Sequence, residues 1–189
     1  MQVPLYSNTT GELTTLQTIS SSRNEESGAY TKMFLKGSDP NVHAIIGVPT
    51  SPLVFVCEGW ATGVAIQKAV NDRVYAAMCC HNLQNTVEYI RKEHPDKFIV
   101  CIADNDSKKE TPDIKGKGQI KAEESGADLV ITIPNPKEDA ADYALKADLR
   151  DFIRSSLIHN KEYREFLNNL EEQNEQKLQQ KNEVKTMTL

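Results

Sequence analysis

Three acidic residues stand directly after short apolar runs of this chain. Glu58 follows the run Leu53–Cys57, and Asp104 and Asp106 follow the run Phe98–Ala103. Short, continuous apolar runs are typical of buried strands in a parallel sheet, and functional sites form at the carboxyl ends of such strands. We therefore expect the three carboxylates to meet at one edge of a sheet.

Three neighbouring carboxylates predict a divalent metal site. They repel one another and raise each other's pKa unless a cation joins them. Mg²⁺ prefers hard oxygen ligands and keeps waters or takes substrate phosphates in its remaining positions. Such an ion neutralises a polyphosphate and stabilises the charge of an in-line displacement. Taken singly, a strand-end aspartate is more often a solvated turn residue or a helix cap, so the prediction depends on the set.

Two residues after the first apolar run have further candidate roles. Glu58 stands just before a predicted helix and is a candidate general acid or base for the attacking hydroxyl or the leaving group. Gly59 has no side chain, so the backbone there is expected to turn sharply and approach a ligand closely.

The elements that position these residues alternate between strand and helix. We predict strands at residues 53–57, 74–79, 98–103 and 129–133, and helices at 60–70, 83–94 and 119–125. Alternation with short links predicts an α/β fold in which helices flank a parallel sheet. Residues 49–148 form this predicted catalytic domain.

The two ends of the chain have different patterns. Residues 1–48 are predicted to be an antiparallel β extension, with strands near 13–19, 30–35 and 44–46 and a loop at 20–28. Residues 149–170 have the spacing of a C-terminal amphipathic helix. The polar tail at 171–189 has too few apolar residues to fold alone, so we expect it to be disordered or a frayed helix.

Composition limits the classes of partner. The chain has 189 residues, a hydrophobic fraction of 39% and a net charge of −5. A protein of this charge must contact nucleic acid through a local basic patch. Its four cysteines form no C-x-x-C pair, which favours buried, reduced thiols over a zinc site. No apolar stretch approaches the roughly 18 residues of a membrane span, so we expect no membrane partner and a cytoplasmic location.

The motifs around the three acids resemble those of the Toprim domain. The segment V-C-E-G-W-A-T at 56–62 resembles the Toprim glutamate–glycine motif in the form carried by primase/helicases of phages and plasmids. The segment I-A-D-N-D at 102–106 resembles the D-x-D motif of the family. Segments between 4 and 37 are similar to the region that precedes Toprim in this group, and 139–143 resembles a late acidic motif. The resemblance covers roughly residues 3–148.

This resemblance implies a Toprim-like fold, dependence on Mg²⁺ or Mn²⁺, and nucleotidyl transfer in primer synthesis for phage or plasmid DNA replication. The implied substrates are a single-stranded DNA template and nucleoside triphosphates. In the family the glutamate is linked to acid–base work and the aspartates to metal binding, so Glu58, Asp104 and Asp106 become the candidate catalytic and metal-binding set. The chain has no P-loop, so a helicase or another replication protein is an expected separate partner.

Candidate contacts to phosphates come from lysines and from the turn at 81–83. The turn H-N-L resembles a small turn followed by N-L in these primases. The loop after Asp106 is rich in lysine and contains Gly116 and Gly118, which suits a flexible basic loop beside a metal, although a solvated loop with ordinary surface lysines is the alternative. The full set of nucleotide- or nucleic-acid-binding candidates is Lys32, Lys36, Gly59, Asn82, Lys115, Lys117 and Lys121.

Three functions remain open at this point. The first is a DNA primase-type nucleotidyltransferase. The second keeps the fold and the metal but cleaves phosphodiesters, as Toprim nucleases do. The third is a non-catalytic module that binds nucleic acid or a replication partner.

Overall fold

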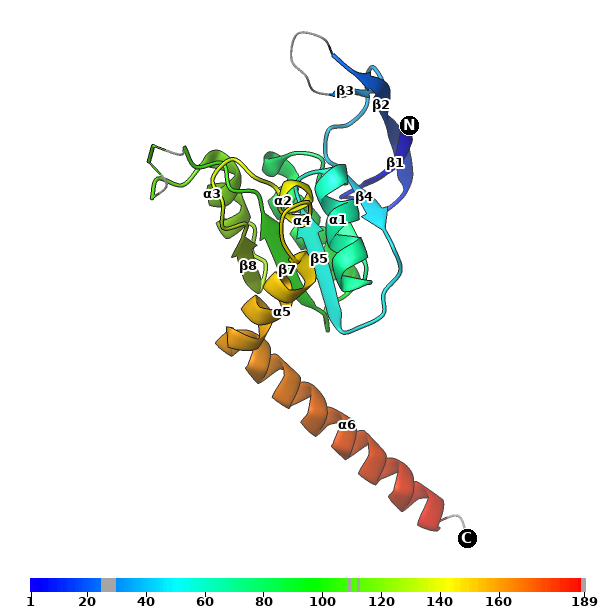
Figure 1. The fold of residues 1–189 in the computed structure, drawn as a ribbon. Helices are drawn as coiled ribbons and strands as arrows, with labels where there is room; N and C mark the ends of the chain where they lie inside the picture. The colour runs from blue at the N-terminus through cyan, green and yellow to red at the C-terminus, as the bar shows by residue number, and fades with distance from the viewer. Residues whose placement is uncertain (25–29, 109, 112, 188–189) are drawn as a thin grey trace.

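The structure, a computed structural model, describes residues 1–24, 30–108, 110–111 and 113–187. In these residues one sheet of eight strands runs through the domain in the order β3-β2-β1-β4-β6-β5-β7-β8 (Figure 1). The strands are β1 (Gln2–Ser7), β2 (Leu13–Arg23), β3 (Tyr30–Phe34), β4 (Val42–Ile46), β5 (Leu53–Cys57), β6 (Val74–Ala76), β7 (Phe98–Ala103) and β8 (Leu129–Thr132). The helices are α1 (Trp60–Val70), α2 (Leu83–Glu93), α3 (Lys117–Glu123), α4 (Ala140–Ala144), α5 (Leu149–His159) and α6 (Lys161–Met187).

The half of the sheet that carries the acidic residues is parallel. β5 lies between β6 and β7, and β7 also pairs with β8. All residues of β5 and β7 are buried. Successive side chains of β5 alternate between two core clusters: Phe55 and Cys57 belong to one, and Val54 and Val56 to the other. This two-residue period confirms the expected strands, which are covered on both faces.

Helices cover the two faces of the sheet in separate groups. On the Phe55 face the core includes Ile66 of α1, Ala140 of α4 and Ile153 of α5. On the other face α2 and α3 contribute, and Val87 is among their buried residues. The structure therefore confirms a mixed α/β domain with one sheet flanked by helices.

The N-terminal strands are antiparallel, as expected, and they continue the same sheet. β4 pairs with β6 and with β1, and β2 lies between β1 and β3. Strand β1 was not predicted individually, and it contains Pro4, a residue type that is disfavoured in central strands. Pro4 is tolerated because β1 pairs with β4 only through Tyr6 and Ser7. Pro4 therefore has a strand neighbour on one side only, where it lies opposite Leu16 of β2. β2 also continues to Arg23, where a loop was expected, and residues 25–29 of that loop lie outside the described residues.

Two further element ends differ from the sequence expectation. The strand expected at 74–79 ends at Ala76, because Met78 takes a left-handed φ of 67° and residues Cys80–Asn82 form a 3₁₀ turn. Cys79 and Cys80 are therefore half-buried at a turn. The helix expected at 119–125 begins two residues earlier, at Lys117.

The C-terminal section consists of two helices rather than one. Asn160 takes extended backbone angles after α5 and accepts a hydrogen bond from the Tyr163 N–H, which starts α6. Tyr163 and Phe166 pack on Phe98, with ring centroids 5.5 and 5.2 Å apart. The expected polar tail is helical as far as Met187, and Figure 1 shows it projecting from the domain. None of the described helices is long and apolar enough to span a membrane.

Candidate metal and catalytic site

The structure places the three predicted acids at neighbouring strand ends. β5 and β7 are adjacent and parallel, with Cys57 opposite Ile102. Glu58 directly follows β5, and Asp104 directly follows β7. We call this region of the sheet, defined by Glu58, Asp104 and Asp106, the acidic rim.

Asp104 is the most strongly perturbed acid of the rim. The pKa of its carboxyl group is raised to about 8, mainly by burial and in addition by neighbouring negative charges. In order of effect, those charges are carried by Asp139, Glu58 and Asp106. Its Oδ1 atom is buried and has no hydrogen-bond partner among the described residues. An unpartnered buried carboxylate oxygen is costly unless a cation or a proton satisfies it.

Glu58 lies close to a second carboxylate and to one lysine. Burial raises its pKa, and the negative charge of Asp106 raises it further. A hydrogen bond from the Cys80 backbone N–H and the positive charge of Lys32 act in the opposite direction. A raised pKa brings a glutamate closer to the range in which general acid–base catalysis works.

Asp106 is held by a close approach of two glycines. The N–H of Gly118 donates to Asp106 Oδ2 at 2.9 Å. A β-carbon at Gly118 would lie 2.5 Å from that oxygen and 3.4 Å from Glu58 Oε2, so both carboxylates border the same small space. A β-carbon at Gly116 would lie 2.2 Å from the Asp106 β-carbon. From the sequence, these glycines were expected to make the loop flexible. Here their absent side chains let helix α3 reach the carboxylate.

Asn105, between the two aspartates, fixes the loop that carries them. Its side-chain amide donates to the Ile133 carbonyl at 2.9 Å, and its Oδ1 accepts from the Ser107 N–H at 3.1 Å. The Ser107 hydroxyl then bonds Gln119 Oε1 at 2.9 Å, and the same oxygen accepts from the Gly116 N–H at 2.7 Å. These bonds tie the D-x-D loop to β8 and to α3, which determines where its carboxylates lie.

Asp139 is a fourth acid that the sequence analysis did not place in the site. It contributes the largest charge effect on Asp104. One of its oxygens caps α4 by accepting from the Asp142 N–H at 2.8 Å, and the other accepts from the Thr62 hydroxyl at 3.2 Å. The late acidic motif at 139–143 was the signal that could have found it. Because both oxygens are already bonded, Asp139 contributes charge and a link between α4 and α1.

The rim fits a divalent ion in donor type but is not a closed ligand cage. Within the residues that the structure describes, no group of three or more His, Cys, Asp or Glu side chains is placed to hold a metal ion. Asp106 is turned toward Gly118, and Glu58 toward the Cys80 N–H. The unpartnered oxygen of Asp104 and the mutual repulsion of the carboxylates are nevertheless what a Mg²⁺ site requires, because hard carboxylate oxygens are its ligands.

The predicted lysines divide into those near the rim and those away from it. Lys32 lowers the pKa values of Glu58 and Asp104, so its charge reaches the rim. Lys117 is the first residue of α3, and its positive charge lowers the pKa of Cys80. Among the described residues, the other three candidates show no link to the rim. Lys115 pairs with Glu123 and Lys121 with Glu124, both at 2.6 Å, and Lys36 is exposed.

The two remaining candidates have structural contacts. Gly59 precedes α1 with an ordinary extended backbone, φ −112° and ψ 156°, and a β-carbon there would meet only Thr62 Oγ1, at 3.6 Å. The sharp turn that we expected at Gly59 is therefore not required. Asn82 is buried and its amide donates to the carbonyls of Pro40 and Val42, so it ties the 3₁₀ turn to β4.

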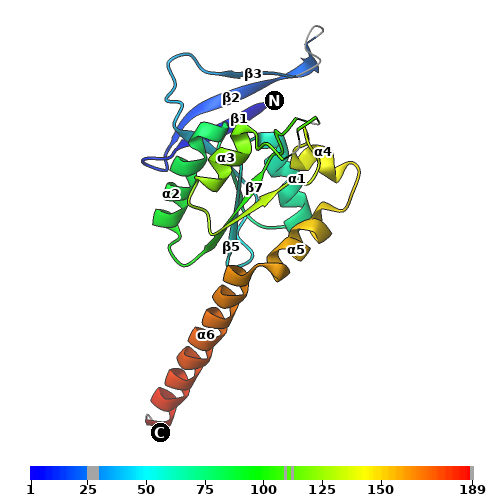
Figure 2. The ribbon, with the colours of Figure 1, turned by 90° about the vertical axis from the view of Figure 1, so that its left-hand side faces the viewer.

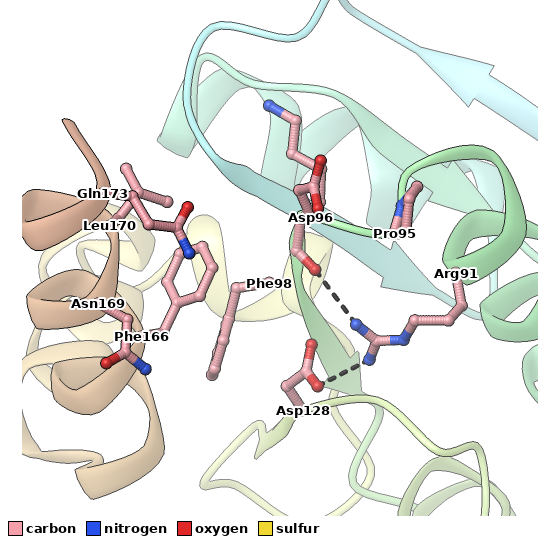
Figure 3. Close-up of a pocket in the computed structure, with 10 residues that line it drawn as sticks. Arg91, Pro95, Asp96, Phe98, Asp128, Phe166, Asn169, Leu170 and Gln173 are labelled. Atoms are coloured by element: carbon pink, nitrogen blue, oxygen red, sulfur yellow. Dashed lines mark hydrogen bonds and ion pairs between the residues drawn. The ribbon is translucent and has the colours of Figure 1, made fainter. Parts of the chain in front are cut away.

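A cavity of about 260 Å³ lies at the other end of the sheet (Figure 3). Two of its charged groups are paired, because Arg91 donates to Asp128 Oδ1 at 2.7 Å and also to the Lys97 carbonyl at 3.2 Å. Phe98 and Phe166 form its apolar side. Because these groups satisfy one another, we interpret this cavity as the junction between α6 and the sheet and not as a reactive site.

Comparison of the chain with models of known protein families, with curated proteins and with solved structures found no match. The account of function therefore depends on the geometry of the rim and on the resemblance of its motifs.

Proposed function

We propose that this protein is a Mg²⁺-dependent, Toprim-type enzyme that carries out nucleotidyl transfer in primer synthesis. The observation that carries the proposal is the acidic rim, where carboxylates from two adjacent parallel strands share one space. The buried Oδ1 of Asp104 has no partner there, and the pKa of this carboxyl group is raised to about 8. The resemblance of the segments at 56–62 and 102–106 to Toprim motifs supports the same assignment.

The residues of the rim take distinct roles in this proposal. Asp104 and Asp106 would hold the ion, and Lys32 lies where it could neutralise a phosphate of the substrate. A bound Mg²⁺ would supply charge neutralisation for the triphosphate and its leaving group. Glu58, with its raised pKa, would accept the proton of the attacking hydroxyl at a carboxylate oxygen.

Primer synthesis on single-stranded DNA tests this proposal directly. The protein is incubated with template, labelled ribonucleotides and Mg²⁺ or Mn²⁺, and the products are resolved by length. We expect short labelled primers from the wild type and none from Asp104→Asn. The matched control is Asp96→Asn, which removes the same charge from an exposed residue at the far cavity.

Two outcomes would overturn the proposal. Shortened template without primers would indicate the nuclease chemistry of other Toprim proteins. Equal behaviour of the wild type and Asp104→Asn, with no dependence on the metal, would favour a non-catalytic module that binds nucleic acid or a replication partner.

A further inference from the structure

Strand β3, at the edge of the sheet, exposes three large side chains, those of Tyr30, Met33 and Phe34. All five residues of β3 are exposed, and Met33 and Phe34 have 58% and 44% of their surface accessible. An apolar edge strand is a liability for aggregation, and exposed apolar groups beside charged ones often mark a binding surface.

The register of β3 on β2 shows which of these side chains face the domain. Lys32 stands opposite Ile19, and Phe34 stands opposite Gln17. Directly paired residues lie on the same face of a sheet. Gln17 is 3% exposed and Ile19 packs on the core, so this is the inward face. Met33 follows Lys32 in the strand and therefore points outward.

The charge of Lys32 shows that this inward face adjoins the acidic rim. It lowers the pKa values of both Glu58 and Asp104. Phe34 is two residues further along, about 7 Å away on the same face. Figure 2 shows β3 crossing the domain at the end opposite α6, above α1 and α3. An exposed aromatic ring and an exposed ammonium group thus lie on the same, inward face of β3.

We propose that Phe34 and Lys32 hold a single strand of nucleic acid at the rim, with a base stacked on the Phe34 ring and a backbone phosphate on the Lys32 ammonium. This inference rests on the proposed function of the rim, and it names the residues that position its polymeric substrate. Charge complementarity favours this occupant, since a chain of net charge −5 needs a local cation to receive a polyanion. Stacking on an aromatic ring accepts every base, so the contact is independent of sequence.

Binding of a labelled oligothymidylate, measured by fluorescence anisotropy with Mg²⁺ present, tests the inference. We expect Phe34→Ala to weaken binding about tenfold, which is typical for removal of one stacking ring. Phe34→Trp should restore it. The matched control is Met33→Ala, an equally conservative truncation in the same strand that points outward and should leave binding unchanged. Lys32→Ala should weaken binding and reduce its dependence on salt.

Any of three results would overturn the inference. Met33→Ala and Phe34→Ala could weaken oligothymidylate binding equally, neither variant could weaken it, or the wild type could fail to bind. Failure of the inference is distinguishable from failure of the proposed function. If Asp104→Asn abolishes primer synthesis but Phe34→Ala does not change oligothymidylate binding, the proposed enzymatic function stands and the proposed stacking contact is wrong. If binding depends on Phe34 but the wild type makes no primers, the stacking contact stands and the proposed enzymatic function is wrong. Thermal melting of each variant confirms that it is folded.

Discussion

The two ends of the parallel strands are built on opposite electrostatic principles. At the far end, Arg91 is bonded to Asp128 and to the Lys97 carbonyl, and the aromatic rings of α6 pack on Phe98. At the carboxyl end, like charges face one another and Asp104 Oδ1 has no partner. One end satisfies its groups internally and stabilises the fold, whereas the other leaves groups unsatisfied, as sites that bind a ligand do.

The largest expected effect comes from a change at the acidic rim. Glu58→Gln keeps the shape of the side chain but removes its ability to exchange a proton, so we expect primer synthesis to fall about 1,000-fold. Metal binding should be less affected than in Asp104→Asn. Steady-state kinetics and Mn²⁺ titration of both variants measure this, and equal loss of metal in the two would contradict the assigned roles.

The second prediction concerns the stability of the fold at acidic pH, which we expect to depend on His43 of β4, away from the rim. Burial lowers its pKa from 6.5 to about 4 in the folded protein, and its Nε2 has no hydrogen-bond partner among the described residues. The unfolded chain therefore binds a proton between these values that the folded protein does not. Stability is complete above pH 6.5 and decreases as the pH falls toward 4, by about 3 kcal/mol in total.

Denaturant unfolding across this pH range measures the effect of His43. His43→Gln, which does not titrate, should flatten the dependence. His94, whose pKa burial also lowers and which bonds Tyr75 at 3.1 Å, acts in the same direction and serves as the second variant. An unchanged slope in His43→Gln would show that the acid sensitivity arises elsewhere.

The third prediction concerns the end that stabilises the fold. Phe166→Ala removes a half-buried ring from Phe98, and we expect it to lower the free energy of unfolding by about 2 kcal/mol. Mn²⁺ binding should be unchanged, because the rim lies at the other end of the strands. Leu178→Ala, on the exposed part of α6, is the control and should have no measurable effect. Loss of metal binding in Phe166→Ala would show that the two ends are coupled.

The last prediction concerns Asp104 and has the opposite sign. Asp104 has a raised pKa in the folded protein, so its carboxyl group lowers stability progressively as the pH rises above the value of about 4 typical of unfolded chains, up to about 8. Without metal, the gain in the free energy of unfolding from Asp104→Asn should therefore be larger at pH 8 than at pH 5. Thermal melting in chelator measures it, and destabilisation would mean that Asp104 has a structural partner.

The sequence predicted the parallel strands well because their residues obey one local rule. β5 and β7 are short, wholly apolar runs, and such runs with an acid directly after them define both the strand and its site. The antiparallel edge was harder, because Pro4 contradicts a strand until the one-sided pairing of β1 is known. The break at Asn160 has a local cause, the Asn160 cap on the Tyr163 N–H, whereas the packing of Tyr163 and Phe166 on Phe98 joins segments that lie far apart in the sequence.

The parts of the site that sequence reasoning missed are those that depend on contacts between distant segments. Gly116 and Gly118 carry no chemistry of their own, and their role follows only from the approach of α3 to Asp106. Asp139 lies 35 positions after Asp104, and its effect arises because α4 begins beside the rim. Lys115 and Lys121, by contrast, looked suitable by composition, but in the structure they pair with glutamates.

The most direct measurement is a titration with Mn²⁺ followed by electron paramagnetic resonance, comparing the wild type with Asp104→Asn and Asp96→Asn. We predict a specific site on the wild type that persists in Asp96→Asn and is lost in Asp104→Asn. Equal binding by all three proteins, or no binding by the wild type, would contradict a shared divalent ion at the acidic rim.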